Sequence, residues 1–410
     1  MSAPQRAAWV PAPNLDIAEG WKQRLILSQN GAPKPILANA ITALQHAPEW
    51  AGVLAYNEFS MATVALKSPP WGGTSAGTEW SDHEDRRATE WLQHQGILVG
   101  VEVSGQAVQV AAKDRTFHPV REYLDGLRWD GIKRIDTWLS LYLGVESSDY
   151  AAAVGSCYLI QAVARIYKPG CKADTCPILE GAQGTLKSTA IRIMGGAWYT
   201  DEIAELGTKD ASLQTLGIWI VELSELDSMS RAEVSRIKSF MSRGTDRFRP
   251  PYGRRVITSP RQCVFVGSVN HSTYLKDDTG GRRFWPVACG SIHIDTLTRD
   301  RDHLWAEAVT QFKAGAPWWL DTKELNHQAE QEQAARFEAD PWQELISEWL
   351  NGRDSVSVPE VLIRCIEKPK DKWLHTDENR VARSLRALSW ERYRERSGNT
   401  LEWRYRRKQA

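Results

Sequence analysis

The sequence has 410 residues, which is enough for two or three domains with a sizeable buried core. Hydrophobic residues make up 42% and charged residues 25% of it, as in an ordinary soluble globular protein. No apolar run is long enough to span a membrane, and the first residues lack the apolar core of a signal peptide, so we expect a cytoplasmic protein with no membrane partner. The net charge of +0 gives no indication of a nucleic-acid partner, so only the charge distribution can provide one.

Residues 1–118 are predicted to form a mixed, mostly helical region. Two stretches have helical spacing of apolar residues, AITALQHAPEW and RRATEWLQHQG, and the stretch AVQVAAK is interpreted as a strand. From Pro119 the periodicity is helical again, through VREYLDGL, IDTWLSLYL and YAAAVGSCYLIQAVARIY. This helical segment is predicted to lead into a core domain over residues 119–335.

Three apolar runs, CPILEG, WIVELSEL and CVFVGSVN, follow at intervals of roughly 40 residues, the spacing of strand–helix units. Each run ends in a polar or glycine turn, which indicates buried parallel strands joined by helices and therefore an α/β core. Residues 341–410 differ in character. Two amphipathic helices precede the alternating strands WERYRER and LEWRYRR, and this order predicts a winged-helix-like domain.

The strongest motif is ILEGAQGTLKSTAIRIMGG, in which an apolar strand leads through a glycine-containing turn into a helix. Phosphates need inward-pointing backbone N–H groups, a helix N-terminus and a lysine, and a hydroxyl beside the lysine can hold Mg²⁺. We therefore predict a P-loop that binds ATP with Mg²⁺, the metal being held by Ser188. The predicted nucleotide-binding residues are Gly181, Gln183, Gly184, Thr185, Leu186, Lys187, Ser188 and Thr189.

Leu186 departs from the usual pattern, which has glycine before the lysine. A Cβ here resists positive φ where the backbone must approach phosphate closely. Two alternatives follow: a chance turn of Gly, Lys and Ser, or a degenerate loop with weak or lost hydrolysis. The strand before the loop, the helix after it and the downstream motifs favour a phosphate loop over a chance turn.

Two polar strand ends complete the predicted catalytic site. Glu222 ends the buried run Ile218 to Val221, and Glu225 lies just beyond it. An acid at this edge can hold the magnesium–water shell, for which we favour Glu222, or orient the attacking water. The alternative is a solvated acidic turn. Asn270 ends the third run, where an amide can contact the attacking water or the γ-phosphate as a sensor, although Asn is also a common turn residue.

Arginines form two further candidate sites. Arg282 and Arg283 follow a glycine turn, and one of them can act as an arginine finger on the site of a neighbouring subunit. The alternative is a solvent-exposed pair. The segment DRFRPPYGRRVITSPR is predicted to form a hairpin. Its arginines form a basic cluster, which includes Arg261. The residues predicted to bind nucleic acid there are Arg247, Arg249, Tyr252, Arg254 and Arg255, with a basic solvated hairpin as the alternative.

The six cysteines lack the paired short spacings of a zinc ribbon. Cys171 and Cys176 are five apart with no second pair nearby. We therefore expect reduced structural thiols.

Taken in order, GAQGTLKST, KDASLQTLGIWIVELSEL, RIKSFMSRGTDRFRPPYGRR, CVFVGSVN and DDTGGRRFWP resemble the virulence-associated protein E family. Members of this family are ATPases of phages and integrated elements, similar to superfamily 3 helicases. The resemblance is dense from about Phe117 to Val287. It implies an AAA+-like core and a hexameric motor on single-stranded DNA.

The resemblance also implies a role for each motif residue. Lys187 and Ser188 would be the phosphate-loop pair, and Glu222 and Glu225 the acids. Asn270 would be the sensor and Arg282 or Arg283 the finger. Arg254 and Arg255 would lie on a DNA hairpin in the central channel of the ring.

The function expected from these observations is an ATP-dependent helicase or translocase on single-stranded DNA, in replication of a phage or integrated mobile element. The expected partners are single-stranded DNA, further copies of the chain in a ring, and replication proteins of the host. Two alternatives stay open. One is an ATPase that loads or remodels replication proteins, and the other is an origin-binding protein with an inactive nucleotide site.

Overall fold

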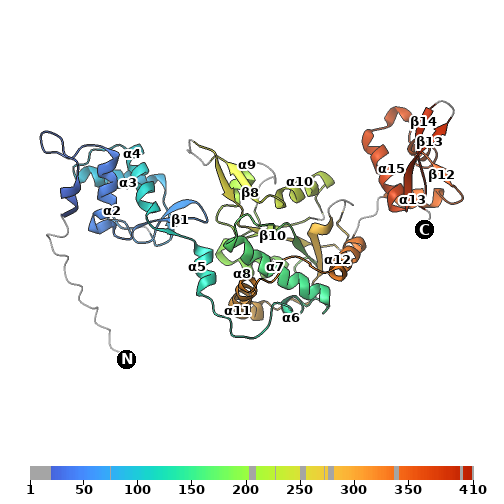
Figure 1. Ribbon diagram of the computed structural model, residues 1–410, viewed down its shortest axis with the longest axis horizontal. Coiled ribbons are helices and arrows are strands. Elements are labelled where there is room, and N and C mark those ends of the chain that lie inside the picture. The colour runs from blue at the N-terminus through green and yellow to red at the C-terminus, as the bar shows by residue number, and fades with distance from the viewer. Residues whose placement is uncertain are drawn as a thin grey trace. The chain divides into compact units, whose positions relative to one another are not determined.

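The computed structural model (Figure 1) describes residues 20–73, 75–202, 209–226, 228–249, 255–271, 273–275, 281–336, 341–397 and 400–408. The chain divides into two compact units. One comprises residues 1–272 with 280–333, and the other comprises residues 273–279 with 334–410. The three-part division predicted from the sequence stays a prediction.

A five-stranded parallel sheet lies at the centre of the first unit, with the strand order β11-β5-β10-β7-β6. Its strands are β5 (Cys176–Glu180), β6 (Tyr199–Thr200), β7 (Ile220–Leu223), β10 (Val264–Val269) and β11 (Phe284–Ala288). Every residue of β5, β7 and β10 is buried, as expected for strands covered on both faces. The three apolar runs are therefore confirmed as parallel strands of an α/β fold.

Helices cover this sheet and supply most of its core. Those before it are α5 (Pro119–Gly126), α6 (Trp138–Leu143) and α7 (Asp149–Tyr167). Those within and after it are α8 (Lys187–Gly195), η3 (Gly196–Trp198), α9 (Lys209–Gln214), α10 (Arg231–Met241), η4 (Gly281–Arg283), α11 (Ile294–Lys313) and α12 (Lys323–Ala335). Both α7 and α8 contact β10, and α11 packs against both helices. None of the helices in the described part of the chain has the length and apolar character needed to cross a bilayer.

Two tryptophans hold α11 against the sheet. Trp219, just before β7, and Trp305 of α11 are fully buried with ring centroids 4.3 Å apart. Their indole N–H groups donate to the carbonyls of Ala162 on α7 (2.9 Å) and Met194 on α8 (3.1 Å). The donors are therefore satisfied while the rings bury their apolar area, and each ring contributes about 2–3 kcal/mol of burial.

The N-terminal part of the first unit contains a second sheet, in the order β3-β2-β1-β4. Its strands are β1 (Leu54–Asn57), β2 (Ala62–Ala65), β3 (Thr78–Glu79) and β4 (Thr116–Phe117). Its helices are η1 (Gly20–Arg24), α2 (Leu37–His46), η2 (Pro48–Trp50), α3 (Asp82–His94) and α4 (Val101–Lys113).

The strand predicted at AVQVAAK is wrong, because these residues are the second half of α4. Its buried side chains include Ala107, Val108, Ala111 and Ala112, which repeat at the spacing of one helix face. The apolar–polar alternation around Gln109 is too short to show this helical period.

The second unit combines helices with a three-stranded sheet in the order β12-β14-β13. Its elements are α13 (Pro341–Trp349), β12 (Ser355–Val356), α14 (Val358–Arg364), η5 (Lys370–Lys372), α15 (His375–Ala387), β13 (Trp390–Ser397) and β14 (Thr400–Arg407). Ile346, Val361, Val381 and Leu385 are fully buried in a core of its own. The antiparallel pairing of β13 with β14 agrees with the two predicted strands, and the winged-helix assignment stays a prediction.

All six cysteines are free, as the sequence predicts. Burial raises the pKa of the Cys157 thiol, and likewise that of Cys289, to about 12. At neutral pH these groups are therefore thiols that pack as small apolar side chains.

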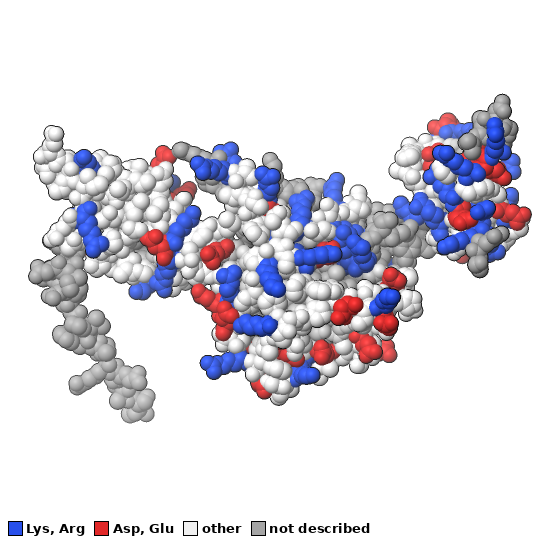
Figure 2. Space-filling model, viewed as in Figure 1, with Lys and Arg blue, Asp and Glu red and all other residues white. Residues whose placement is uncertain are grey.

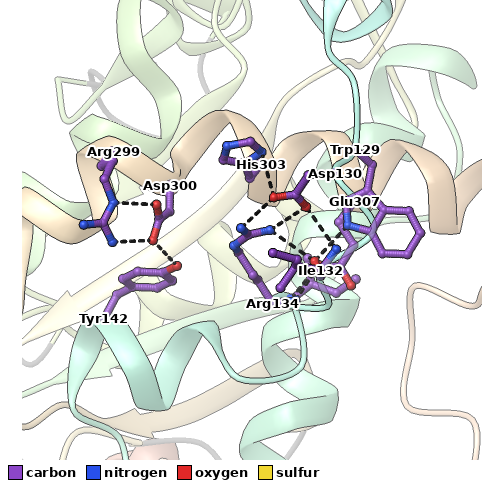
Figure 3. Close-up of polar contacts among 10 residues, drawn as sticks. Trp129, Asp130, Ile132, Arg134, Tyr142, Arg299, Asp300, His303 and Glu307 are labelled. Carbon is purple, nitrogen blue, oxygen red and sulfur yellow. Dashed lines mark hydrogen bonds and ion pairs between the residues drawn. The ribbon is translucent and has the colours of Figure 1, made fainter.

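A polar network joins the segment before α6 to α11 (Figure 3). Arg134 donates to both carboxylate oxygens of Asp130 at 2.8 Å, and this bidentate contact lowers the pKa of Asp130. The Glu307 carboxylate of α11 accepts from the backbone N–H groups of Arg134 (2.6 Å) and Ile135 (3.1 Å). Glu307 is 1% exposed, and burial raises its pKa. This carboxylate therefore fixes the turn that positions α6.

Replacing Glu307 by Ala would leave one buried and one partly buried N–H group without their acceptor, and we expect the free energy of unfolding to fall by about 2 kcal/mol. Glu307→Gln keeps an acceptor oxygen without the charge and is the matched control. Urea denaturation at neutral pH measures both variants. An Ala variant as stable as the natural protein would contradict this role.

The pH dependence of the same pair has a definite sign. Because burial raises the pKa of Glu307, the folded state favours the neutral carboxyl. The stability from this preference is present below the ordinary glutamate pKa and is lost as pH rises through the raised value. The free energy of unfolding of Glu307→Gln should therefore rise, relative to the natural protein, from acidic to neutral pH.

Candidate functional site

The loop between β5 and α8 follows the carboxyl end of a central strand. Gly184 has φ +83° and Leu186 has φ +66°, so the backbone turns twice through the left-handed region before α8 begins at Lys187. Glycine adopts this region freely, whereas a leucine is strained there by about 1–2 kcal/mol. The Leu186 side chain is 49% exposed, so little apolar burial offsets that strain.

Lys187 is buried at the start of α8 and its ammonium is directed into the loop. Nζ donates to the carbonyls of Gly181 (2.6 Å) and Ala182 (3.0 Å), and lies 3.5 Å from Oδ1 of Asn270. Asn270 follows β10, which pairs with β5, so the adjacent strand ends bring the predicted lysine and sensor together. The ammonium is thus held where its positive charge faces the loop and the amide.

Glu222 lies beside this lysine site, on β7. It is 2% exposed, and three hydroxyl groups donate to its carboxylate: Ser188 (2.7 Å) and Ser268 (2.6 Å) to one oxygen, and Tyr199 (2.5 Å) to the other. Burial first, and then the bond to Glu222, raise the pKa of Tyr199, so the phenol remains a donor at neutral pH. These bonds satisfy carboxylate oxygens that would otherwise be costly to bury.

Sequence reasoning missed Tyr199 and Ser268. Ser268 could have been predicted from the sequence. It lies two residues before Asn270 in an otherwise apolar strand, and residues two apart in a strand point to the same face. Tyr199 opens β6, a two-residue strand with no periodicity to reveal it.

The remaining predicted residues around the loop are less engaged. Gln183 and Thr189 are exposed, and the Thr185 hydroxyl donates to the carbonyl of Ala182 (2.9 Å). Ser188 is also exposed, but its hydroxyl contacts Glu222. Glu225 is exposed in the turn after β7 with φ +55°, and its carbonyl accepts from Ser228. The structure thus brings Glu222, but not the Glu225 carboxylate, into contact with the loop residues.

The donors present suit a nucleotide with a magnesium ion. The N-terminal N–H groups of α8 and the Lys187 ammonium can face phosphate, and the contacting Ser188 and Glu222 oxygens are hard ligands. In the described part of the chain there is no cluster of three or more His, Cys, Asp or Glu residues that could hold a metal ion. A cation that keeps several waters and shares ligands with phosphates, as Mg²⁺ does, needs only one or two protein ligands.

Arg282 and Arg283 lie at the opposite end of the sheet, where the amino ends of its strands lie. They form η4 and lead into β11, whose first residue, Phe284, pairs with Cys176, the first residue of β5. The loop begins only after β5 has run its five residues, about 17 Å at roughly 3.3 Å per residue. Arg283 pairs with Asp174 at 3.5 Å, whereas Arg282 is exposed.

A cavity of about 450 Å³ lies beside the two arginines, lined also by Lys172, Trp318 and Trp319. The arginines therefore border a hollow surface that is remote from the loop of their own chain.

The predicted hairpin is present as β8 (Thr245–Phe248) and β9 (Ile257–Pro260), paired antiparallel. Arg247, Arg249 and Arg255 are exposed on it, while Tyr252 and Arg254 lie outside the described residues. Arg261 differs from the predicted basic cluster. It is 3% exposed and pairs with Asp246 at 2.5 Å, so it stabilises the base of the hairpin.

A model of the virulence-associated protein E-like domain matches residues 124–338, just over half of the chain. No curated protein matches the sequence. The chain is similar to the apo structure of the NrS-1 C-terminal region (305–718), with TM-score 0.45 and 13% identity over 86% of this chain and 95% of that one. The A form apo structure of that region gives TM-score 0.40 and 12% identity, over 69% and 77%.

Leu186→Gly tests the strained loop. We expect the free energy of unfolding to rise by up to about 1 kcal/mol, because glycine relieves the left-handed strain and partly offsets this with its own chain entropy. Affinity for ATP should be kept or raised. Thermal unfolding and calorimetric titration measure the two quantities.

Leu186→Ala is the control, because it removes the same apolar side chain and keeps the Cβ. If alanine stabilised the protein as much as glycine, the backbone angle would not be the cause. A large loss of nucleotide affinity in Leu186→Gly would show that the loop requires leucine.

Proposed function

The chain belongs to the virulence-associated protein E-like family, and we propose that it is an ATPase that moves along or unwinds single-stranded DNA during replication of a phage or integrated mobile element. The observation that carries this proposal is the convergence of Lys187, the Ser188–Glu222 pair and Asn270 at one edge of a parallel sheet. In open α/β sheets, ligands bind at the carboxyl ends of the strands.

In the proposed site, the β5–α8 loop surrounds the phosphates and Lys187 neutralises the outer ones. Ser188 and Glu222 hold Mg²⁺, which would lower the cost of charge on the phosphoryl oxygens. Glu222 already accepts three hydroxyl hydrogen bonds, which suits the water shell of a metal better than proton abstraction. Asn270 and the exposed Glu225 are left to orient the attacking water.

We propose that Arg282 completes the site of a neighbouring copy. Its distance from the loop of its own chain supports action between subunits, and its exposure leaves it available. Arg283 is already paired with Asp174 and suits a supporting role. A closed ring satisfies such a head-to-tail contact for every copy, and six copies is the number that the family resemblance implies.

Single-stranded DNA is proposed to contact the β8–β9 hairpin. Arg247 and Arg249 are exposed, whereas Asp246 and Phe248 between and before them are buried, so the strand turns positive charge outward. Arg255 is exposed at the start of the returning segment. A row of cations along a protruding hairpin suits a phosphate backbone.

The direct test is ATP turnover with and without single-stranded DNA. The natural protein should hydrolyse ATP, and DNA should stimulate it. Lys187→Ala should lose turnover by at least about a hundredfold while the far-ultraviolet circular dichroism is unchanged, because the ammonium serves the phosphates. Turnover at the natural rate would refute the site. Turnover that DNA does not stimulate would favour an ATPase that remodels other proteins.

Arg282→Ala should bind ATP nearly normally and hydrolyse it about a thousandfold more slowly, as expected for loss of an arginine finger. Mixing it with Lys187→Ala chains creates interfaces with an intact loop from one chain and an intact finger from the other, so activity should partly return. Labelled chains report whether subunits exchange. A dead mixture of exchanging subunits would place the arginine outside the neighbour's site.

A further inference from the structure

The β13–β14 ribbon of the second unit separates its charges by face. Side chains alternate across the two paired strands, and the register places Arg394 opposite Trp403 and Tyr393 opposite Arg404. One face, called here the arginine face, contains Trp390, Arg392, Arg394, Arg396, Trp403, Tyr405 and Arg407. The other, called the paired face, contains Glu391, Tyr393, Glu395, Glu402, Arg404 and Arg406. All the acidic residues of the ribbon thus lie on one face.

Ion pairs neutralise the arginines of the paired face. Arg406 bonds Glu391 at 2.8 Å, and Arg404 contacts Glu395 at 3.0 Å and Glu360 of α14 at 3.2 Å. Figure 2 shows the mixed basic and acidic side chains of this unit, at the labels α15, β13 and β14 of Figure 1. The paired face therefore has little charge to offer a ligand.

The arginine face has the opposite character. Arg392, Arg394, Arg396 and Arg407 are exposed, and no carboxylate of the described residues pairs with their guanidinium groups. Trp390 and Tyr405 are buried at its base, which anchors the strands in the core of the unit. The outer part of the ribbon therefore presents a row of unneutralised cations on a fixed support.

Trp403 holds two of these cations in place. The guanidinium carbons of Arg392 and Arg394 lie 3.9 Å and 4.5 Å from the centroid of its ring, which is 44% exposed. A guanidinium ordered on an aromatic ring loses less conformational freedom when it binds an anion. The ring is also engaged by arginines, so it does not offer a clear face for stacking a base.

The spacing of the row suits a phosphate backbone. Alternate residues of a strand are about 6.8 Å apart, which is close to the distance between successive phosphates along one nucleic-acid strand. Single-strand sites add free aromatic rings for base stacking, whereas duplexes can be held by phosphate contacts alone. We propose that the arginine face of the β13–β14 ribbon binds the phosphate backbone of duplex DNA without reading its sequence.

The test uses the full chain without nucleotide and a fluorescent 30-base-pair duplex of arbitrary sequence. Arg394→Gln with Arg396→Gln removes two cations from the arginine face. The control is Arg406→Gln with Lys408→Gln. It removes one cation from the paired face and one just after β14, with the same change in net charge. Anisotropy titrations over a range of salt concentrations give the affinity and its salt dependence.

We expect the log–log salt slope of the first variant to become shallower by about 1.8 and its affinity at 0.1 M salt to fall roughly tenfold or more, whereas the control changes little. Arg396→Gln alone should change the slope by about 0.9, which guards against a folding defect in the double variant. Equal losses in both double variants, or an unchanged slope in the first, would overturn the proposal.

A single-stranded oligonucleotide separates this proposal from the function proposed above. The first variant should keep its single-strand affinity and its DNA-stimulated ATP turnover. Loss of single-strand binding with duplex binding retained would overturn the assignment to duplex DNA. Absence of ATP turnover in the natural protein would refute the ATPase proposal and leave the duplex measurement intact.

Discussion

The parallel pairing of β5 between β11 and β10 is the constraint on which the arrangement of the candidate site depends. Backbone hydrogen bonds fix Glu180 opposite Val269, so the loop after β5 and Asn270 after β10 emerge side by side. The same register fixes Phe284 opposite Cys176, so Arg282 and Arg283 lie at the amino ends of the strands, opposite the loop. One set of pairings therefore brings the lysine and amide together and separates both from the arginines.

Glu222 links this register to the electrostatics of the site. Its carboxylate is buried on β7 and receives hydroxyls from α8, β6 and β10. A buried carboxylate without donors would be costly, so these three hydroxyls satisfy the Glu222 oxygens beside the start of α8. The three donors come from α8, β6 and β10. The packing of these elements therefore also determines the orientation of the Ser188 hydroxyl.

Two of the five non-glycine residues with positive φ in the described part of the chain lie at the carboxyl end of the sheet. These are Leu186 (φ +66°) after β5 and Glu225 (φ +55°) after β7, whereas Met61, Glu367 and Ser389 lie elsewhere. Left-handed conformations of residues other than glycine persist where surrounding structure holds them, and such positions cluster at functional sites.

The second unit separates its charges by strand register. Its ribbon pairs acids with arginines on one face and leaves the other face cationic, so the separation of charge depends on strand register.

The sequence by itself determined the buried parallel strands, because long apolar runs ending in polar turns have few other structures available. It also identified Lys187, Ser188, Glu222 and Asn270 as candidates, since each lies at a strand end or a helix start that can be read locally. It failed at AVQVAAK, where a short alternation concealed a helix, and it included Arg261 in an exposed cluster. Tyr199, the Asp246–Arg261 pair and the position of Arg282 opposite the loop were decided only by the tertiary structure. Each depends on which segments become neighbours in the sheet, and strand order and pairing register are properties of the whole chain that no local pattern contains.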